Sequence, residues 1–236
     1  MRVDVQPAYI LHHYAYRDTS QIIELFTRDY GRLSVISRGT RSAKSKLKSI
    51  LQVFRPLHVS WSGKGDLPSL TMAESAEARM PQLSGKALPS AFYLNELLMR
   101  LLHRHDVHDD IFNLYHHTLF TLAETDQLEV TLRLFEKQLL NLLGFGINLD
   151  TDAESGEPIV EDGHYVYYIE HGPVALKSDE QQQLAHHLVI KGRSLLSFDR
   201  DKLETDAERK EVKSLMRLVL SYYLGEKPLK SRELFR

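Results

Sequence analysis

The hydrophobic pattern of this 236-residue chain changes near residue 80, and that change limits what the chain can fold into. Before residue 80, apolar residues alternate with polar ones in short runs; Leu57 and Val59, for example, share one face of an expected strand. After the segment 80–89, which contains Pro and Gly, apolar residues recur every three or four positions, as in amphipathic helices. The pattern predicts an α+β protein with a β-domain over residues 1–80 and a mostly helical domain over 81–236.

The first domain is predicted to be a small β-barrel. Turn residues separate five expected strands, at 9–14, 21–27, 32–37, 50–62 and 69–76. Five short strands with the longest loop between the third and the fourth favour an OB-fold, which often binds single-stranded nucleic acid. An SH3-like barrel is the alternative.

The second domain is predicted to hold helices and one small inserted hairpin. The expected helices span residues 90–103, 109–123, 127–143, 179–190 and 207–224. An acidic insert at about 147–176 interrupts them, since Leu149 to His164 contain six acids and no Lys or Arg. The hairpin is expected to begin at Tyr165 within this insert.

Positive charge is concentrated in one part of the chain. Residues 30–65 contain eight of the thirty Lys and Arg residues and no Asp or Glu, and the rest of the chain has twenty-two basic against thirty-two acidic residues. A basic block on an acidic body attracts a polyanion to one face, and nucleic acid is the commonest polyanion. Its densest part, residues 38–48, interleaves cations with Gly, Ser, Thr and Ala, which indicates a loop.

Nucleic-acid contacts are therefore predicted in and around this loop. Cations follow the phosphates of a single strand, and aromatic side chains stack on its bases. The predicted contacts are Arg32, Arg38, Arg41, Lys44, Lys46, Lys48 and, for stacking, Trp61. The alternatives are a solvated basic loop and a Trp61 that belongs to the barrel core.

Two helical surfaces are further candidates. Arg209, Lys213 and Arg217 recur at every fourth position of the last helix, which predicts a basic stripe for DNA or, alternatively, a solvated face. In the helix 127–143, Arg133 lies among apolar neighbours and either forms an ion pair one turn away or receives an acidic peptide at an apolar groove. The residues of that expected groove are Leu132, Arg133, Phe135 and Leu139.

Several chemistries are excluded or disfavoured by the sequence. The chain has no cysteine, which excludes disulfides and thiolate metal sites, and it lacks the phosphate-loop, nucleophile-elbow, zinc-protease and dinucleotide motifs. The cluster His103 to Asp110 could ligate a metal, but His and Asp also complement the ends of adjoining helices, and no metal or cofactor is predicted. No apolar stretch is long enough for a signal peptide or a membrane span, which predicts a cytoplasmic protein.

Several segments together resemble the bacterial RecO family, in order and spacing across essentially the whole chain. They are Tyr9-Ile-Leu-His, Phe26-Thr-Arg-Asp-Tyr-Gly-Arg, Arg38-Gly-Thr-Arg-Ser, Leu94-Asn-Glu-Leu-Leu, Leu132-Arg-Leu-Phe-Glu, Leu142-Leu-Gly-Phe-Gly and Lys227-Pro-Leu-Lys-Ser-Arg-Glu-Leu-Phe. Many relatives carry a four-cysteine zinc module at the position of the acidic insert. Because this chain has no cysteine there, the zinc site is not carried over.

The resemblance implies a non-enzymatic mediator of DNA repair and recombination, associated with the nucleoid. Such a protein binds single- and double-stranded DNA, anneals strands without ATP, and acts with RecR and single-stranded DNA-binding protein in loading RecA. The resemblance places DNA on the basic loop and the acidic tail of single-stranded DNA-binding protein on the helix that holds Arg133. The alternatives are a general single-strand-binding OB protein and a metal-dependent nuclease that uses the cluster at residues 103–110.

Overall fold

The computed structural model describes residues 2–42, 45–77, 79–176 and 188–235. Within these ranges, every helix is too short or too polar to cross a membrane. The chain forms two compact units. Unit 1 comprises Met1–Asp126 and Pro228–Arg236, and unit 2 comprises Gln127–Lys227. The predicted boundary at residue 80 marks the change from strands to helices, but the first compact unit continues through two further helices.

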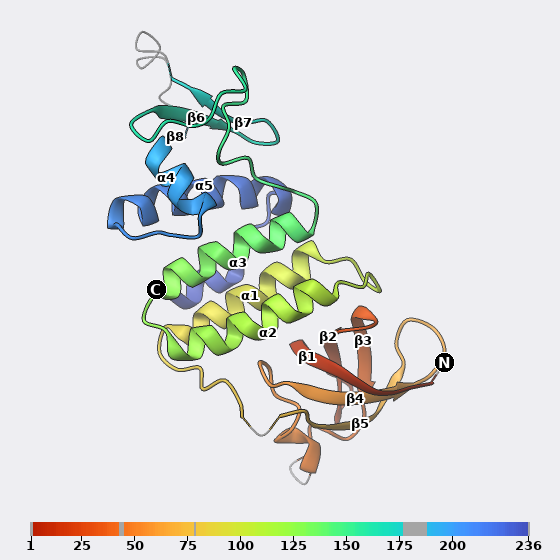
Figure 1. Cartoon of the computed structure of the whole chain (residues 1–236). Coiled ribbons are helices and arrows are strands. Elements are labelled where there is room, and N and C mark those ends of the chain that lie inside the picture. The colour runs from red at the N-terminus through yellow and green to blue at the C-terminus, as the bar shows by residue number, and fades with distance from the viewer. Residues whose placement is uncertain (1, 43–44, 78, 177–187, 236) are drawn as a thin grey trace. The chain divides into compact units, whose positions relative to one another are not determined.

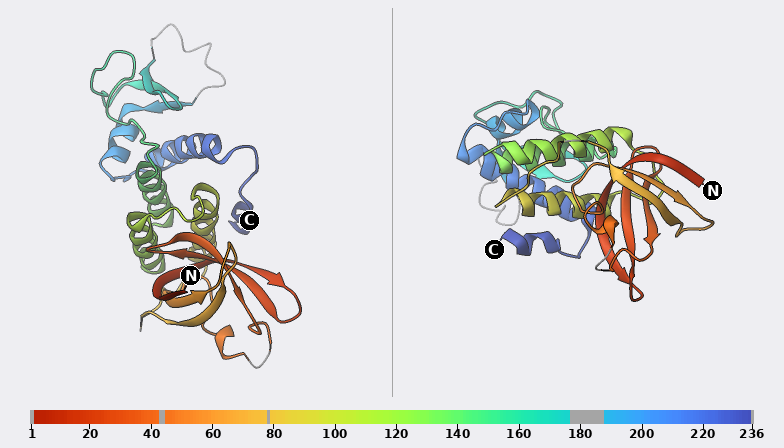
Figure 2. Two further views of the ribbon diagram at one scale, coloured as in Figure 1. Left: turned by 90° about the vertical axis from the view of Figure 1, so that its right-hand side faces the viewer. Right: turned by 90° about the horizontal axis from the view of Figure 1, so that it is seen from below.

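Unit 1 begins with a closed five-stranded barrel (Figure 1 and Figure 2). Its strands are β1 (Arg2–Tyr16), β2 (Ser20–Thr27), β3 (Gly31–Ser37), β4 (Leu57–Ser62) and β5 (Ser69–Ser75). They pair in the order β1-β2-β3-β5-β4, and β4 closes the barrel on β1. All pairs are antiparallel except β3 and β5, which meet in parallel where Ile36 lies opposite Ser69. The predicted α+β fold with an OB-like barrel is confirmed.

The barrel interior is filled by alternate residues of the five strands. On β2 and β3, Ile23 pairs with Val35 and Leu25 with Leu33, and all four are buried. Trp61 belongs to the same core: it is 3 % exposed, and its ring lies edge-on against Tyr30. The prediction that Trp61 stacks on bases is therefore wrong, because the alternation that places Leu57 and Val59 inside the barrel also places Trp61 there.

The fourth predicted strand, residues 50–62, is too long. The strand begins only at Leu57, after a short 3-10 helix, η1 (Lys46–Lys48), and an irregular segment. Phe54 has a positive φ of 66°, and Pro56 has no backbone N–H for a ladder hydrogen bond, so neither suits a regular strand. Phe54 is buried and its ring contacts Phe92.

Two α-helices of unit 1 pack against the barrel. They are α1 (Ala87–Leu101) and α2 (Asp109–Glu124). Aromatic residues make the contact, since the rings of Tyr9 on β1 and Phe26 on β2 both lie against Phe112 and Tyr115 of α2. Asn95 of α1 donates a buried hydrogen bond to the carbonyl oxygen of Leu11 at 2.9 Å. Because one face of each helix is apolar, burial against the barrel stabilises both elements together.

The C-terminal segment also belongs to unit 1. The 3-10 helix η2 (Lys230–Phe235) packs on α1, where the Glu96 carboxylate accepts hydrogen bonds from the backbone N–H groups of Lys230 and Ser231 and from the Ser231 hydroxyl. Although partial burial opposes ionisation, these hydrogen bonds hold the pKa of Glu96 below its ordinary value.

The described residues of unit 2 form three helices and a three-stranded sheet. The helices are α3 (Leu128–Leu142), α4 (Gly192–Asp199) and α5 (Asp206–Leu224); the strands are β6 (His164–Tyr168), β7 (Gly172–Ala175) and β8 (Val189–Lys191), in the order β7-β6-β8. The predicted hairpin is β6–β7. Strand β8 and helix α4 were not predicted. Most of the helix predicted at 179–190 lies outside the described residues, and its last two positions belong to β8.

The acidic insert is ordered by hydrogen bonds around one carboxylate. Asp152 is 5 % exposed and accepts hydrogen bonds from the backbone N–H groups of Glu154, Ser155 and Ala175 at 2.7–2.9 Å. Burial opposes its ionisation, but the backbone donors outweigh that effect and lower the pKa of Asp152. A buried carboxylate thus fastens the loop at 152–155 to β7.

Candidate nucleic-acid interface

The basic loop, defined as residues 38–48, follows β3 and leaves its described cations in solvent. Arg38, Arg41 and Lys48 are exposed. Lys44 lies outside the described residues, and so does the side chain of Lys46, whose backbone is the first residue of η1. Three of the predicted cations are therefore placed where a phosphate can reach them.

The first part of the basic loop is fixed against the turn between β1 and β2. The Arg41 backbone N–H donates to the carbonyl oxygen of Thr19 at 3.0 Å, and the Arg41 guanidinium donates to the carbonyl oxygen of Arg17, also at 3.0 Å. The Thr40 hydroxyl donates to the carbonyl oxygen of Ser37 at 3.2 Å. These bonds bring Arg17, which is exposed, to the same edge of the barrel as Arg41, although the two are far apart in the sequence.

Arg32 has a structural role that the sequence alone did not reveal. Its guanidinium is bound to the carboxylate of Glu24, which is 1 % exposed and also accepts hydrogen bonds from Ser34 and Arg104 at 2.6 and 3.0 Å. The carbonyl oxygen of Arg32 accepts a hydrogen bond from the backbone of His105. Only 14 % of the Arg32 side chain is exposed. This cation therefore ties the connection between α1 and α2 to the barrel and is not available to a phosphate.

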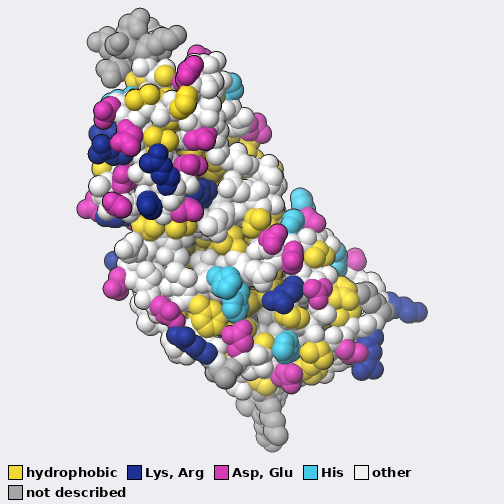
Figure 3. Space-filling model, in the orientation of Figure 1, with side chains coloured by type: hydrophobic (Ala, Val, Ile, Leu, Met, Phe, Trp, Pro, Cys, Tyr) yellow, Lys and Arg dark blue, Asp and Glu magenta, His cyan; other side chains and the backbone are white. Residues whose placement is uncertain are grey.

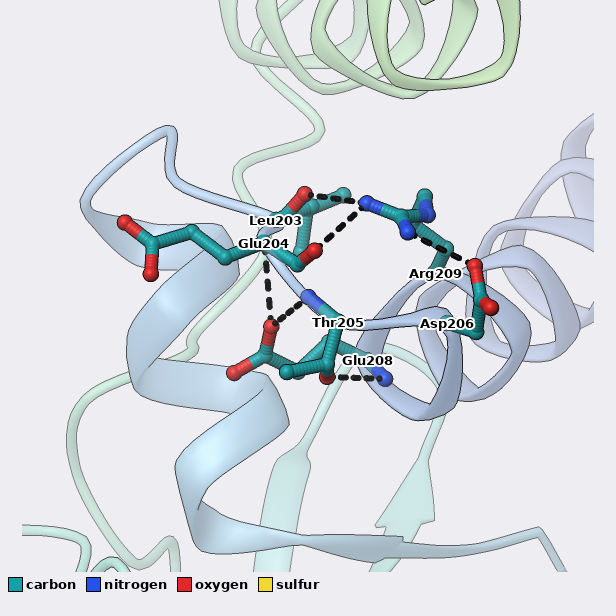
Figure 4. Close-up of polar contacts among 6 residues, drawn as sticks. All are labelled: Leu203, Glu204, Thr205, Asp206, Glu208 and Arg209. Carbon is teal, nitrogen blue, oxygen red and sulfur yellow. Dashed lines mark hydrogen bonds and ion pairs between the residues drawn. The ribbon is translucent and has the colours of Figure 1, made fainter.

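Arg209, the first member of the predicted stripe on α5, clamps the start of its own helix (Figure 4). Its guanidinium donates to the carbonyl oxygens of Leu203 and Glu204 at 3.0 and 2.8 Å and pairs with Asp206 at 2.6 Å. Beside it, Thr205 and Glu208 form a capping box, in which each side chain accepts a hydrogen bond from the other residue's backbone N–H.

Glu208 strengthens this cap because it is held in its charged form. Burial opposes ionisation of Glu208, yet hydrogen bonds from the backbone of Thr205 and from the hydroxyl of Ser197 lower the pKa of its carboxyl. A carboxylate in the first turn also complements the positive end of the helix dipole. The cations and acids at this end of α5 are therefore used for capping.

The other two cations of the stripe differ from each other. Lys213 pairs with Glu129 of α3 at 3.0 Å, whereas Arg217 is exposed. On the face shown in Figure 3, the Lys and Arg side chains of unit 2 lie among Asp and Glu rather than forming a separate patch. Of the three predicted cations, only Arg217 remains a candidate for DNA contact.

We expect Arg209→Ala to lower the free energy of unfolding by about 1–2 kcal/mol, because it removes charge-assisted hydrogen bonds that are partly open to solvent. DNA affinity should stay the same. Urea unfolding and a DNA titration of the same preparation measure both quantities, and Lys210→Ala, at an exposed cation of the same helix, is the matched control for charge. A drop in DNA affinity with unchanged stability would return Arg209 to the DNA interface.

The residues of the predicted peptide groove on α3 are all buried. Leu132 and Arg133 are 7 % exposed, Phe135 is 1 % exposed and Leu139 is fully buried. The Arg133 guanidinium forms an ion pair with Glu136, which is fully buried, one turn along the helix. The structure thus agrees with the ion-pair alternative. An acidic tail would have to displace Glu136 and find access to a side chain that is 8 % exposed.

The cluster at residues 103–110 does not assemble a metal site. Within the described part of the chain, no three His, Asp or Glu side chains converge as metal ligands. His103 and His105 are exposed, and His108 instead pairs with Asp106 at 3.0 Å. The segment packs closely on the barrel, since a Cβ at Gly31 would lie 2.0 Å from the carbonyl oxygen of Asp106.

The comparisons with known proteins agree over the whole chain. Residues 1–79 match the family described as "Recombination protein O N terminal", and residues 82–233 match "Recombination protein O C terminal". Proteins named "DNA repair protein RecO" from Nitrosococcus oceani, Dechloromonas aromatica and Coxiella burnetii are 43 %, 42 % and 43 % identical to it. These alignments cover 99 %, 100 % and 99 % of this chain and 93 %, 96 % and 98 % of the relatives.

Proposed function

Because the chain belongs to the RecO family of DNA repair proteins, we propose that it is a non-enzymatic mediator of DNA repair and recombination. In this proposal it binds single- and double-stranded DNA through the basic loop and anneals complementary strands. The observation that carries the proposal is the exposure of Arg38, Arg41 and Lys48 at one edge of an OB-like barrel, in a stretch of sequence without any acid.

The physical basis of annealing is charge neutralisation. Two DNA strands repel each other through their phosphates, and Lys and Arg side chains that replace bound counterions reduce that repulsion. Base pairing and stacking then supply the driving force for the duplex. The protein needs only to hold phosphates loosely at an exposed cationic surface, so the mechanism requires no bond to be broken in either strand and no nucleotide.

The proposed protein partners are inferred from membership in the RecO family and not from a binding surface identified on this chain. We assign RecR and the acidic tail of single-stranded DNA-binding protein as direct partners, RecA as an indirect one, and the nucleoid in the cytoplasm as the location. Membership in the RecO family supports this assignment. The residues Leu132, Arg133, Phe135 and Leu139 of α3 remain the predicted tail site. Binding there requires the tail to reach the buried Arg133 and to replace Glu136 as its partner.

We expect the pure protein to anneal complementary strands without ATP and in the presence of EDTA, and to lose that activity at high salt. Phosphate contacts weaken steeply as salt rises, whereas a chelator leaves Lys and Arg unchanged. Annealing is measured with labelled strands, naked or coated with single-stranded DNA-binding protein. Activity on the coated strands separates a mediator from a general single-strand-binding OB protein.

The nuclease alternative makes the opposite prediction. If the protein is a nuclease, added Mg²⁺ or Mn²⁺ should cause it to shorten DNA strands. Substitution of His108 should then abolish this cleavage. Annealing that stops on chelation and returns with a metal ion would contradict the metal-free mechanism.

A further inference from the structure

The outer face of the β1–β2 hairpin carries aromatic side chains beside the basic loop. Tyr14 and Tyr16 are two positions apart on β1, so their side chains lie on the same face of the strand. Tyr14 pairs with Ile22 of β2, and Tyr16 pairs with Ser20. Next to Tyr14 in register, His13 pairs with Ile23, which is fully buried in the barrel core. Because successive residues of a strand point to opposite faces, Tyr14 and Tyr16 lie on the outside of the barrel.

Tyr14 is exposed and Tyr16 is partly exposed, and a cation lies beside the Tyr16 ring. Tyr14 is 43 % exposed, and its ring lies 4.5 Å from the ring of His12, which is exposed on the same face. The guanidinium of Arg17 lies 5.2 Å from the centre of the Tyr16 ring, within cation–π distance. Arg17 stays exposed while its carbonyl oxygen binds the Arg41 side chain. The hydrogen bonds of Arg41 therefore bring rings and cations to one edge of the barrel.

This combination has the chemistry of a single-strand site. Every base has a π-face that stacks on an aromatic ring, and cations beside the ring hold the adjoining phosphates. In a duplex the base faces are already stacked on each other, so rings at the protein surface gain nothing from them. The aromatic residues of the stretch 30–65 cannot serve, since Phe54 and Trp61 are buried and Tyr30 packs on Trp61.

We infer that nucleobases of single-stranded DNA stack on Tyr14 and Tyr16, while Arg17, Arg38 and Arg41 bind the phosphates on either side. The inference rests on the proposed function and adds to it: the basic loop binds any DNA, and the tyrosines select unpaired strands. When a complementary strand arrives, the bases would leave the tyrosine rings and pair with the bases of that strand.

The test compares two ligands of equal length, an oligothymidylate and an oligonucleotide made of abasic sites, at one salt concentration. Tyr14→Ala should weaken oligothymidylate binding by about 5- to 150-fold, the range for removal of one stacked ring, and leave abasic binding unchanged. Tyr14→Phe should keep nearly full affinity for both, because the ring remains. Tyr222→Ala, at an exposed tyrosine of unit 2, is the matched control and should change neither.

The possible results distinguish failure of the stacking role from failure of the proposed DNA-binding function. Equal weakening of both ligands by Tyr14→Ala, or no weakening of either, would overturn the stacking role while DNA binding itself stands. Failure of the wild-type protein to bind either ligand would instead overturn the proposed function. Tyr14→Leu supplies a second variant that keeps apolar area without a π-face, and it should behave as Tyr14→Ala does. Circular dichroism of each variant tests whether it is folded.

Discussion

Replacing Arg133 with alanine is expected to lower the free energy of unfolding by about 3–5 kcal/mol, because the substitution breaks an ion pair with a buried carboxylate. Glu136 is fully buried, and its ion pair with Arg133 lies within α3. Urea unfolding followed by circular dichroism measures the change. Gln138→Ala, at an exposed position of the same helix, is the control and should change stability by less than about 0.5 kcal/mol.

A double substitution separates the effect of breaking the ion pair with Glu136 from the effect of losing the Arg133 side chain. Arg133→Met combined with Glu136→Leu removes both charges and keeps comparable volume, so we expect most of the missing stability to return. A double variant as unstable as Arg133→Ala would show that the arginine acts through packing or other partners rather than by neutralising Glu136.

The same variants test the predicted acidic-tail site. If a tail binds the Arg133 guanidinium, it competes with Glu136, and Glu136→Gln should raise the affinity for a labelled tail peptide, provided that the variant is folded. If Arg133 is purely structural, Glu136→Gln should leave tail affinity unchanged. Tail titrations of the wild type and of this variant therefore distinguish the two roles without relying on the less stable alanine variant.

Helices and strands could be predicted from the sequence where one face of the element is buried along its whole length. The alternation of Leu57 and Val59 and the helical spacing of Leu132, Phe135 and Leu139 both reflect burial along a single element. The segment at 50–56 and the helix α4 were harder, because a positive φ at Phe54 and a helix of eight residues leave weak periodic signals.

The roles of individual cations were less predictable, because they depend on partners distant in sequence. Arg32 is bound by Glu24 on another strand, together with Arg104 from beyond α1, and Lys213 is bound by Glu129 of another helix. Arg209 is the exception, since its partners Leu203, Glu204 and Asp206 lie close to it in the sequence. Tyr14 and Tyr16 were not predicted as contacts, because the expected strand ended at Tyr14 and the closeness of Arg17 to Arg41 depends on the folded barrel.

The second large effect is expected at the basic loop. Replacing Arg38, Arg41 and Lys48 together with alanine removes three exposed cations. Removing one phosphate contact should flatten the slope of log affinity against log salt by about 0.7 on single strands and about 0.9 on duplex DNA. For three contacts, and with equal affinities at about 1 M salt, single-strand affinity should fall roughly 500-fold at about 50 mM salt and roughly 30-fold at about 200 mM salt.

A charge-matched triple variant in unit 2 controls for the change in net charge. Arg200, Lys202 and Lys210 are exposed, and their replacement by alanine alters the total charge by the same amount. We expect this variant to bind DNA almost as tightly as the wild type and to keep the wild-type salt slope. An equal drop in affinity in both triple variants would indicate long-range attraction by the whole protein instead of contacts at the loop.

The proposed function requires that the edge of the barrel at the basic loop bind the phosphates of DNA. The salt dependence of single-strand affinity in the wild type and in the Arg38→Ala, Arg41→Ala, Lys48→Ala variant tests it most directly. We expect a slope that is shallower by about 2 in the variant, with similar decreases in affinity on different base sequences. Equal slopes and equal affinities for the folded variant and the wild type would contradict it.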